Sequence, residues 1–402
     1  MKKPVLHNTR ALLLILFFAT YVLGQLQRIQ VTPQIAFYVH DLVLFLYLVT
    51  TIATYQKQLH KALKNKMKLR WSVRLLLGWL MLGWMIAYIS GSFSPRAVLY
   101  AGRFLLYIST TFTFFHWPVS LQKRQFTVSK LKMLYLLAGS LFLLFGLLQY
   151  LLLPDTRFLS IMGWDDHYYR LVSTLLDPGF AGIILVLTFI HLTQCSFITN
   201  ATAWLLKIVL VLGVVLTYSR ASYLALVVTF FMLAIKNWRT LKSNAAYLAL
   251  GGVFCLLVLL APKPGGEGVN LVRTSTIDSR LSGAVAVAGE LSPVQWIVGR
   301  GAFMPLQSDD LSASRPYHAQ TSDNSVLLLI SNLGLVGVGM LLLISWQQRY
   351  RLARTEYIAV VALVAVLVHS QFNNTLFEPF VLLFVTGVVL SAYYSRKVTV
   401  SS

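Results

Sequence analysis

Acidic residues are scarce in this sequence. Aspartate and glutamate together number 13 among 402 residues, against 34 lysines and arginines, so the formal net charge is +21. Charged residues of both signs make up only 12% of the chain, whereas soluble domains have about 25%. Because 57% of the residues are hydrophobic, the composition excludes an ordinary soluble globular protein.

Cysteine is nearly absent as well. The two cysteines, Cys195 and Cys255, both lie in apolar stretches, which excludes an extracytoplasmic disulfide framework and a cysteine-based zinc site. A clean small-x-small cleavage motif is also missing. Met1-Lys2-Lys3 precedes an apolar run like that of a signal peptide, but further apolar runs follow. We therefore expect the first run to be retained as a helix.

The excess of basic residues would indicate a nucleic-acid partner in a soluble protein. Here the lysines and arginines lie between apolar runs, where they set the orientation of membrane helices. We therefore expect a lipid bilayer, and no nucleic acid, as a partner.

Long apolar runs fill most of the chain, and a transmembrane helix needs about 20 such residues. The sequence predicts an all-α integral membrane protein with about twelve helices, at residues 11–26, 36–55, 71–91, 97–117, 131–153, 178–198, 202–218, 220–236, 245–261, 324–346, 356–371 and 375–394. The run from Trp204 to Ile235 is too long for one span, because a helix rises about 1.5 Å per residue and the membrane core is about 30 Å thick. We place a turn at its polar centre, Tyr218-Ser219-Arg220.

The charges predict the orientation of these helices. If they alternate, the basic clusters fall on one side, at residues 2–10, 57–70, 123–132, 236–242, 349–354 and 396–397. Most acids fall on the opposite side, and only Glu356 is clearly among the basic clusters. The positive-inside rule then places both termini in the cytoplasm. The expected organisation is nine helices in residues 1–261, an extracytoplasmic loop at 262–323, and three helices with a cytoplasmic tail at 324–402.

The polar segment from Pro262 to Ser322 is much longer than a connection between two spans requires. Long ordered loops are usually functional, so we expect it to form half of an active site. Within it, the apolar spacing from Asp278 to Glu290 predicts a short amphipathic helix on the outer surface. The glycines between Pro293 and Phe303 favour a turn with close backbone approach.

Three predicted helices start at the outer face with a capping residue. Asp177 followed by a proline is typical of a helix start. Ser219 holds the same position before residue 220, and Asp323 or Asn324 does so before the helix at 324–346. For Asp177 and Ser219 capping alone is a sufficient explanation.

Arg220 needs a further explanation, because a cation in the first turn opposes the helix dipole and is costly within a membrane. A guanidinium at a helix N-terminus is a good phosphate site, so we assign Arg220 to an anion. The alternative is that the Arg220 side chain extends to the membrane–water interface without binding an anion. Arg280 repeats the pattern at the start of the loop helix. For Arg103 two interpretations stay open, added charge at the anion site or a structural ion pair with Asp41.

His318 is the histidine of this loop, and it lies close in sequence to Asp323. Histidine has a reference pKa of about 6.5 and accepts protons at neutral pH, so it is a candidate general base. The alternative is a solvated surface histidine.

Four segments occur in a fixed order around this loop: Arg170 to Gly182, Thr217 to Ser222, Arg280 with Trp296 to Gly301, and Asn324 to Gly337. In that order they resemble the O-antigen ligase and O-antigen polymerase superfamily over most of the chain. They are similar to its segment entering the sixth helix, its serine-arginine turn, its loop arginine with a glycine turn, and the helix after its catalytic histidine. Ligases of that family have histidine directly before the asparagine, whereas this chain has Asp323.

The resemblance implies a GT-C-like glycosyltransferase of cell-surface polysaccharide biosynthesis, such as that of lipopolysaccharide. It implies a polyprenyl-diphosphate-linked glycan donor, a glycan or lipid acceptor, an inverting transfer, and no metal or cofactor. The active site is expected at the outer face of the cytoplasmic membrane. The expected site consists of diphosphate-binding Arg220 and Arg280, the weaker helpers Arg170 and Arg103, and His318 or Asp323 as the base.

The alternative class is a twelve-helix transporter of polysaccharides or small molecules. Transporters have broken helices and ionisable residues near the membrane midplane. In this sequence no acid lies deep in a predicted span, and the unusual charges gather at one face. The pattern therefore favours the enzyme. It does not distinguish a ligase, which moves a finished glycan, from a polymerase, which extends one.

Overall fold

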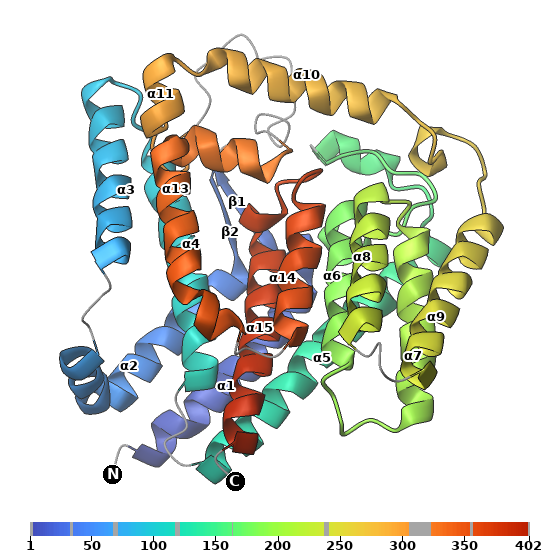
Figure 1. The fold of residues 1–402 in the computed structure, drawn as a ribbon, viewed down its shortest axis with the longest axis horizontal. Helices are drawn as coiled ribbons and strands as arrows, with labels where there is room; N and C mark the ends of the chain where they lie inside the picture. Colours follow the sequence, from blue (N-terminus) through green and yellow to red (C-terminus); the bar gives the residue numbers. More distant parts are fainter. Residues whose placement is uncertain are drawn as a thin grey trace. The chain divides into compact units, whose positions relative to one another are not determined.

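The computed structural model describes residues 3–32, 35–66, 71–116, 121–162, 164–236, 241–304, 323–353 and 357–400. These residues are mostly α-helical (Figure 1). The sheet described among them has two strands, β1 (Arg28–Thr32) and β2 (Ile35–Tyr38). The chain divides into unit 1 (Met1–Phe17, Ile29–Thr113 and Ser275–Arg354) and unit 2 (Phe18–Arg28, Phe114–Thr274 and Thr355–Ser402).

An α-helix occupies each apolar range predicted from the sequence. These helices are α1 (Lys3–Val22), α2 (Val39–Lys66), α3 (Trp71–Ile89), α4 (Pro95–His116), α5 (Leu121–Leu152), α6 (Pro178–Leu192), α7 (Asn200–Leu216), α8 (Arg220–Lys236), α9 (Leu241–Leu260), α13 (Ser325–Ala353), α14 (Tyr357–His369) and α15 (Pro379–Val400). The shorter helices are α10 (Ser275–Glu290), α11 (Pro293–Val298), η1 (Gly24–Gln27), η2 (Arg157–Met162), η3 (Ser173–Leu175), η4 (Glu267–Val269) and η6 (Thr375–Phe377).

Four of the described helices are long and apolar enough to cross a membrane, at Val39–Gln56, Trp71–Ile89, Val128–Leu152 and Ser325–Gln347. The mostly helical fold is therefore confirmed, whereas the count of twelve spans stays a prediction. The two strands differ from the all-α prediction. They lie between the first two helices, where residues 28–38 contain β-branched and aromatic residues that favour extended backbone.

Unit 2 is built around α6. All of its residues except Phe180 are buried, and it packs against α5, α7, α8, α14 and α15. A helix that is apolar on every side requires such surroundings. Close packing is possible because small residues face each other: a Cβ at Gly182 would lie 2.3 Å from Oγ of Ser222 on α8. The start of α6 is therefore held among several helix ends of the same unit.

Unit 1 contains a broken helix. α13 is interrupted at Gly334, whose φ is 66° and ψ is 173°. A break leaves backbone carbonyls without helical partners, and unsatisfied carbonyls are costly in an apolar environment. The carbonyls of Ser331 and Asn332 accept from the backbone nitrogens of Arg300 (2.8 Å) and Gly301 (3.2 Å).

A third carbonyl at the break is satisfied by a side chain. Nε1 of Trp79 on α3 donates to the Leu333 carbonyl at 2.8 Å. The segment after α11 therefore docks on the break by its backbone, and close approach requires glycine. A Cβ at Gly299, whose φ is 83°, would lie 2.5 Å from the carbonyl oxygen of Asn332. The predicted close approach is confirmed. The predicted turn is wrong for residues 293–298, where a capping box formed by Ser292 starts α11.

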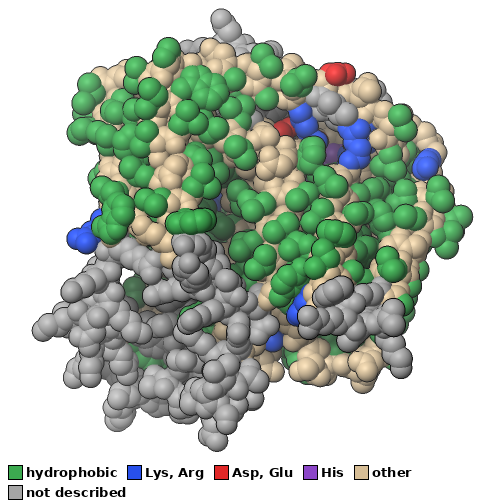
Figure 2. All heavy atoms as spheres, viewed as in Figure 1, with side chains coloured by type: hydrophobic (Ala, Val, Ile, Leu, Met, Phe, Trp, Pro, Cys, Tyr) green, Lys and Arg blue, Asp and Glu red, His purple; other side chains and the backbone are tan. Residues whose placement is uncertain are grey.

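Large apolar side chains are exposed along several helices, as the face in Figure 2 illustrates. Leu42 of α2, Phe231 of α8, Leu248 of α9 and Leu342 of α13 are 60%, 66%, 72% and 66% exposed. Soluble monomers rarely expose apolar surface to this extent, and a bilayer would cover it. The structure is therefore compatible with a lipid bilayer as a partner.

Candidate functional site

The turn between α7 and α8 lies where the sequence predicts it. Tyr218 has a left-handed conformation with a φ of 50°, and α8 starts two residues later. Oγ of Ser219 accepts a hydrogen bond from the backbone nitrogen of Ser222 at 3.3 Å, which is an N-cap. The Tyr218 hydroxyl donates to the Pro262 carbonyl, so the turn is tied to the segment after α9. Arg220 thus extends from a fixed turn.

The side chain of Arg220 is half-buried against the segment after η4. Its Nη1 atom donates to the carbonyl oxygens of Arg273 at 2.8 Å and Leu271 at 3.4 Å. These bonds go to neutral groups, which orient a guanidinium without cancelling its charge.

Two further arginines of unit 2 meet the same segment. Nε of Arg170 donates to the Thr217 carbonyl at 3.0 Å, and a Cβ at Gly268 would lie 3.1 Å from Cδ of Arg170. Nη1 of Arg273 donates to the Gly268 carbonyl at 2.5 Å. We call Arg170, Arg220 and Arg273 the arginine cluster. It places the guanidinium groups of Arg170 and Arg220 at the start of α8, with Arg273 in the segment that contacts Arg220, which is a suitable arrangement for an anion.

A buried hydrogen-bond chain supports the turn. Oγ of Ser222 donates to Oγ of Ser219 at 2.9 Å and lies 3.1 Å from Nε2 of His369 on α14. Nδ1 of His369 lies 2.7 Å from Oγ1 of Thr375. These groups are almost fully buried. Satisfied buried networks hold their members rigidly, so this chain fixes the turn that carries Arg220.

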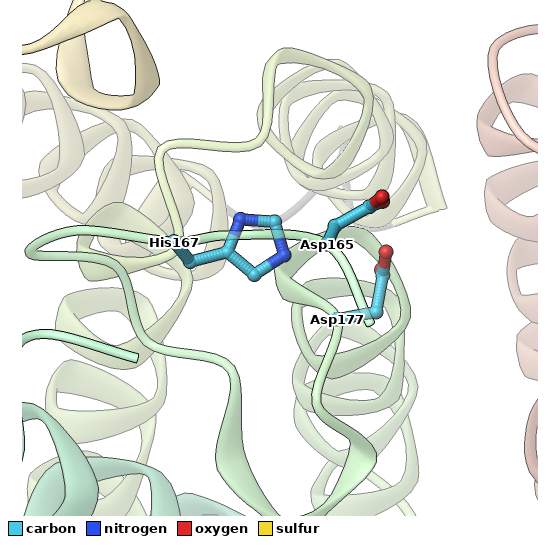
Figure 3. Close-up of side chains that lie close together, drawn as sticks. All are labelled: Asp165, His167 and Asp177. Atoms are coloured by element: carbon cyan, nitrogen blue, oxygen red, sulfur yellow. The ribbon is translucent and has the colours of Figure 1, made fainter. Parts of the chain in front are cut away.

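Asp165, His167 and Asp177 lie close together before α6 (Figure 3). Oδ1 of Asp177 accepts from the backbone nitrogen of Phe180 at 2.7 Å, so the predicted N-cap is confirmed. Removal from water raises the pKa of the Asp177 carboxyl, although the bond to Phe180 and the charge of Arg170 act in the opposite direction. Burial, together with the charges of Arg170 and Arg273, lowers the pKa of His167 to about 3, although the charge of Asp165 acts in the opposite direction. His167 is therefore neutral, and it lies within electrostatic reach of Arg170 and Arg273.

Arg103 belongs to unit 1, where it forms the predicted alternative, an ion pair. Its Nη2 lies 3.0 Å from Oδ2 of Asp41 and donates to the Ala36 carbonyl at 2.7 Å. The Tyr107 hydroxyl donates to the other oxygen of Asp41, and Nε2 of His40 lies 3.0 Å from that hydroxyl. This buried network favours a structural role for Arg103. A mostly apolar cavity of about 290 Å³ lies beside it.

Arg280 and Asp323 are also in unit 1. Nε of Arg280 on α10 lies 3.4 Å from Oδ2 of Asp323. Asn324, and not Asp323, caps α13, since its Oδ1 accepts from the backbone nitrogens of Val326 (2.9 Å) and Leu327 (3.0 Å). The structure thus brings one predicted phosphate ligand together with one predicted base. His318 lies outside the described residues.

Two of the site residues were not assigned a role from the sequence. Arg273 stood among several loop arginines without a distinguishing neighbour, and only its contact with Arg220 singles it out. His167 follows two aspartates, which was a weak signal. Its proximity to Asp177, ten residues later, depends on the fold of the intervening segment.

Comparison with protein-family models finds none that matches this chain. Comparisons with curated proteins and with solved structures likewise find no match.

Proposed function

We propose that the protein is a membrane glycosyltransferase of the O-antigen ligase or polymerase type. It transfers a glycan from a polyprenyl-diphosphate donor to an acceptor hydroxyl at the outer face of the cytoplasmic membrane, with both termini in the cytoplasm. The observation that supports the proposal is the arginine cluster: Arg170 and Arg220 at the start of α8 and Arg273 in the adjoining segment, each oriented by backbone carbonyls.

Transfer from such a donor releases a diphosphate, and negative charge develops on it as the glycosidic bond breaks. Positive groups placed where charge develops stabilise the transition state. Arg220 and Arg170 have this role in the proposal, and Arg273 joins them. Arg280 belongs to unit 1, and its assignment to the diphosphate stays a prediction from the sequence. Arg103 forms the ion pair with Asp41 that the sequence analysis gave as the alternative, so the proposal assigns it no role at the diphosphate.

The acceptor hydroxyl must lose a proton as it attacks the sugar. The two candidates from the sequence are His318 and Asp323. Asp323 is engaged with Arg280, which favours a positioning role for this carboxylate. His318 is therefore the proposed proton acceptor, and Asp323 is the alternative.

The proposal is tested with purified full-length protein in lipid nanodiscs and a polyprenyl-diphosphate-linked glycan. Wild-type protein should release polyprenyl diphosphate when an acceptor glycan or lipid is present, and Arg220→Ala should release almost none. The matched control is Arg157→Ala, since Arg157 is exposed and bonded to Asp155 in the same unit. Equal release by wild-type protein and Arg220→Ala would contradict the proposal. In cells, a deletion should accumulate the lipid-linked glycan, with long chains indicating a ligase and single repeat units a polymerase.

A further inference from the structure

Asp165, His167 and Asp177 form a compact group of three potential metal ligands. One ligand atom from each residue lies within 4.8 Å of the other two. Figure 3 shows a ring nitrogen of His167 directed toward the two aspartates, whose carboxylate oxygens lie next to each other. We propose that these three side chains bind a divalent transition-metal ion.

The strongest support comes from His167, which is buried and whose backbone is held in place. The residue is 8% exposed, and its carbonyl accepts from both the backbone nitrogen and Oγ1 of Thr156 at 2.9 Å. Nε2 is buried without a hydrogen-bond partner among the described residues. Buried polar atoms nearly always have a hydrogen-bond or metal partner, and among the described residues this nitrogen has no hydrogen-bond partner. A metal ion between the imidazole and the carboxylates would be its partner.

The two aspartates complete the site in different ways. Asp177 is fixed by the start of α6, because Oδ1 caps the helix. Asp165 is exposed, so an ion has a path from solvent to the buried histidine. Neutral imidazole with two carboxylates is a ligand set suited to Zn²⁺ or Mn²⁺, whereas Ca²⁺ and Mg²⁺ take oxygen ligands.

The arginines set a limit on the affinity. Arg170 and Arg273 act electrostatically on His167, and both oppose a cation. The two carboxylates offset these charges, so an added divalent ion leaves the neighbourhood positive. With the metal ion bound, the arginine cluster is more favourable for an anion than it is without the ion. This inference departs from the metal-free chemistry that the resemblance implies, and it does not depend on the proposed function.

The experiment uses full-length protein in nanodiscs, freed of metal with a chelator and titrated with Mn²⁺ alone. Electron paramagnetic resonance counts the bound ions, and its pulsed form detects coupling to an imidazole nitrogen. We expect one saturable site per chain with nitrogen coupling. His167→Ala should remove the nitrogen coupling and weaken Mn²⁺ binding about tenfold or more. Asp165→Asn should weaken Mn²⁺ binding to a similar extent but keep the nitrogen coupling.

Asp166→Asn is the matched control, because Asp166 is exposed, lies between Asp165 and His167 in the sequence, and is not part of the group. It should bind Mn²⁺ as the wild type does. Asp165→Asn changes an exposed side chain and should fold normally, which keeps the test valid if His167→Ala unfolds. Absence of saturable binding by folded wild-type protein would overturn the inference. Equal binding by wild type and Asp165→Asn would overturn it too.

Discussion

Nε of Arg280 lies 3.4 Å from Oδ2 of Asp323, which joins the loop helix α10 to the start of α13. From the sequence the two residues had separate roles, at the diphosphate and at the acceptor. Their pairing within unit 1 means that a substitution at either one changes the surroundings of the other. Variants of Asp323 must therefore be interpreted together with those of Arg280.

The first prediction concerns the base. His318→Ala should lower transfer by about a hundredfold or more, the usual contribution of general base catalysis. Asp323→Asn keeps a polar group beside Arg280 and should lower transfer much less. Donor consumption at several pH values measures both effects. If Asp323→Asn lowers the transfer rate more than His318→Ala does, and His318→Ala leaves it nearly unchanged, the base is Asp323.

The second prediction concerns the arginine cluster. Arg220→Lys should lower transfer about tenfold or more, because a charge-assisted hydrogen bond contributes about 1.5–3 kcal/mol and an ammonium cannot form the paired contacts of a guanidinium. Expression should be unchanged, since the residue is at a turn. The control is Arg157→Lys, because Arg157 is an exposed arginine of the same unit. The prediction is checked by comparing the transfer rates of wild type, Arg220→Lys and Arg157→Lys at equal amounts of each protein in the membrane.

The third prediction concerns Arg103. Asp41→Ala should destabilise the protein by about 3–5 kcal/mol, because it leaves a largely buried guanidinium without its carboxylate partner. Asp155→Ala removes an exposed carboxylate and should change stability by about 0.5 kcal/mol or less. Unfolding of detergent-solubilised protein gives both values. If Arg103→Ala abolishes transfer in protein of unchanged stability, then Arg103 binds substrate after all.

The fourth prediction concerns the docking of the loop on α13. Gly299→Ala should destabilise the protein by more than about 1 kcal/mol, since the residue has a φ of 83° and a Cβ would lie 2.5 Å from a carbonyl oxygen. Gly283→Ala is the control, because its Cβ would meet nothing within 4 Å in the helix α10. That change should be neutral or stabilising. Equal melting temperatures for the two variants would contradict the described approach.

The fifth prediction concerns orientation. In a variant with Cys195 and Cys255 replaced by alanine, Val272→Cys should react with a membrane-impermeant thiol reagent in cells whose outer barrier is removed. Ser196→Cys, at an exposed turn between α6 and α7, should react only after the membrane is opened. Val272 is 84% exposed, so access is not limited by packing. The opposite labelling pattern would reverse the orientation.

Much of the fold could be predicted because apolar runs of helical length leave few alternatives. The caps at Asp177 and Ser219 were also predicted, since capping is a local property of sequence. The break at Gly334 was not, because a glycine within an apolar run only breaks a helix when distant groups satisfy the freed carbonyls. For the same reason the partner of Arg220 could not be foreseen. Its contact with Arg273 spans 53 residues.

The break in α13 also bears on the order of events during membrane insertion. Its carbonyls are satisfied by Trp79 from a helix made earlier and by Arg300 and Gly301 from the preceding loop. Before these groups arrive, lipid offers no hydrogen-bond donors, so a continuous helix is the lower-energy form of this segment. If α13 is inserted into a bilayer before α3 and the loop contact it, we expect it to enter as a continuous helix. The break would then form only when α3 and the loop pack against α13.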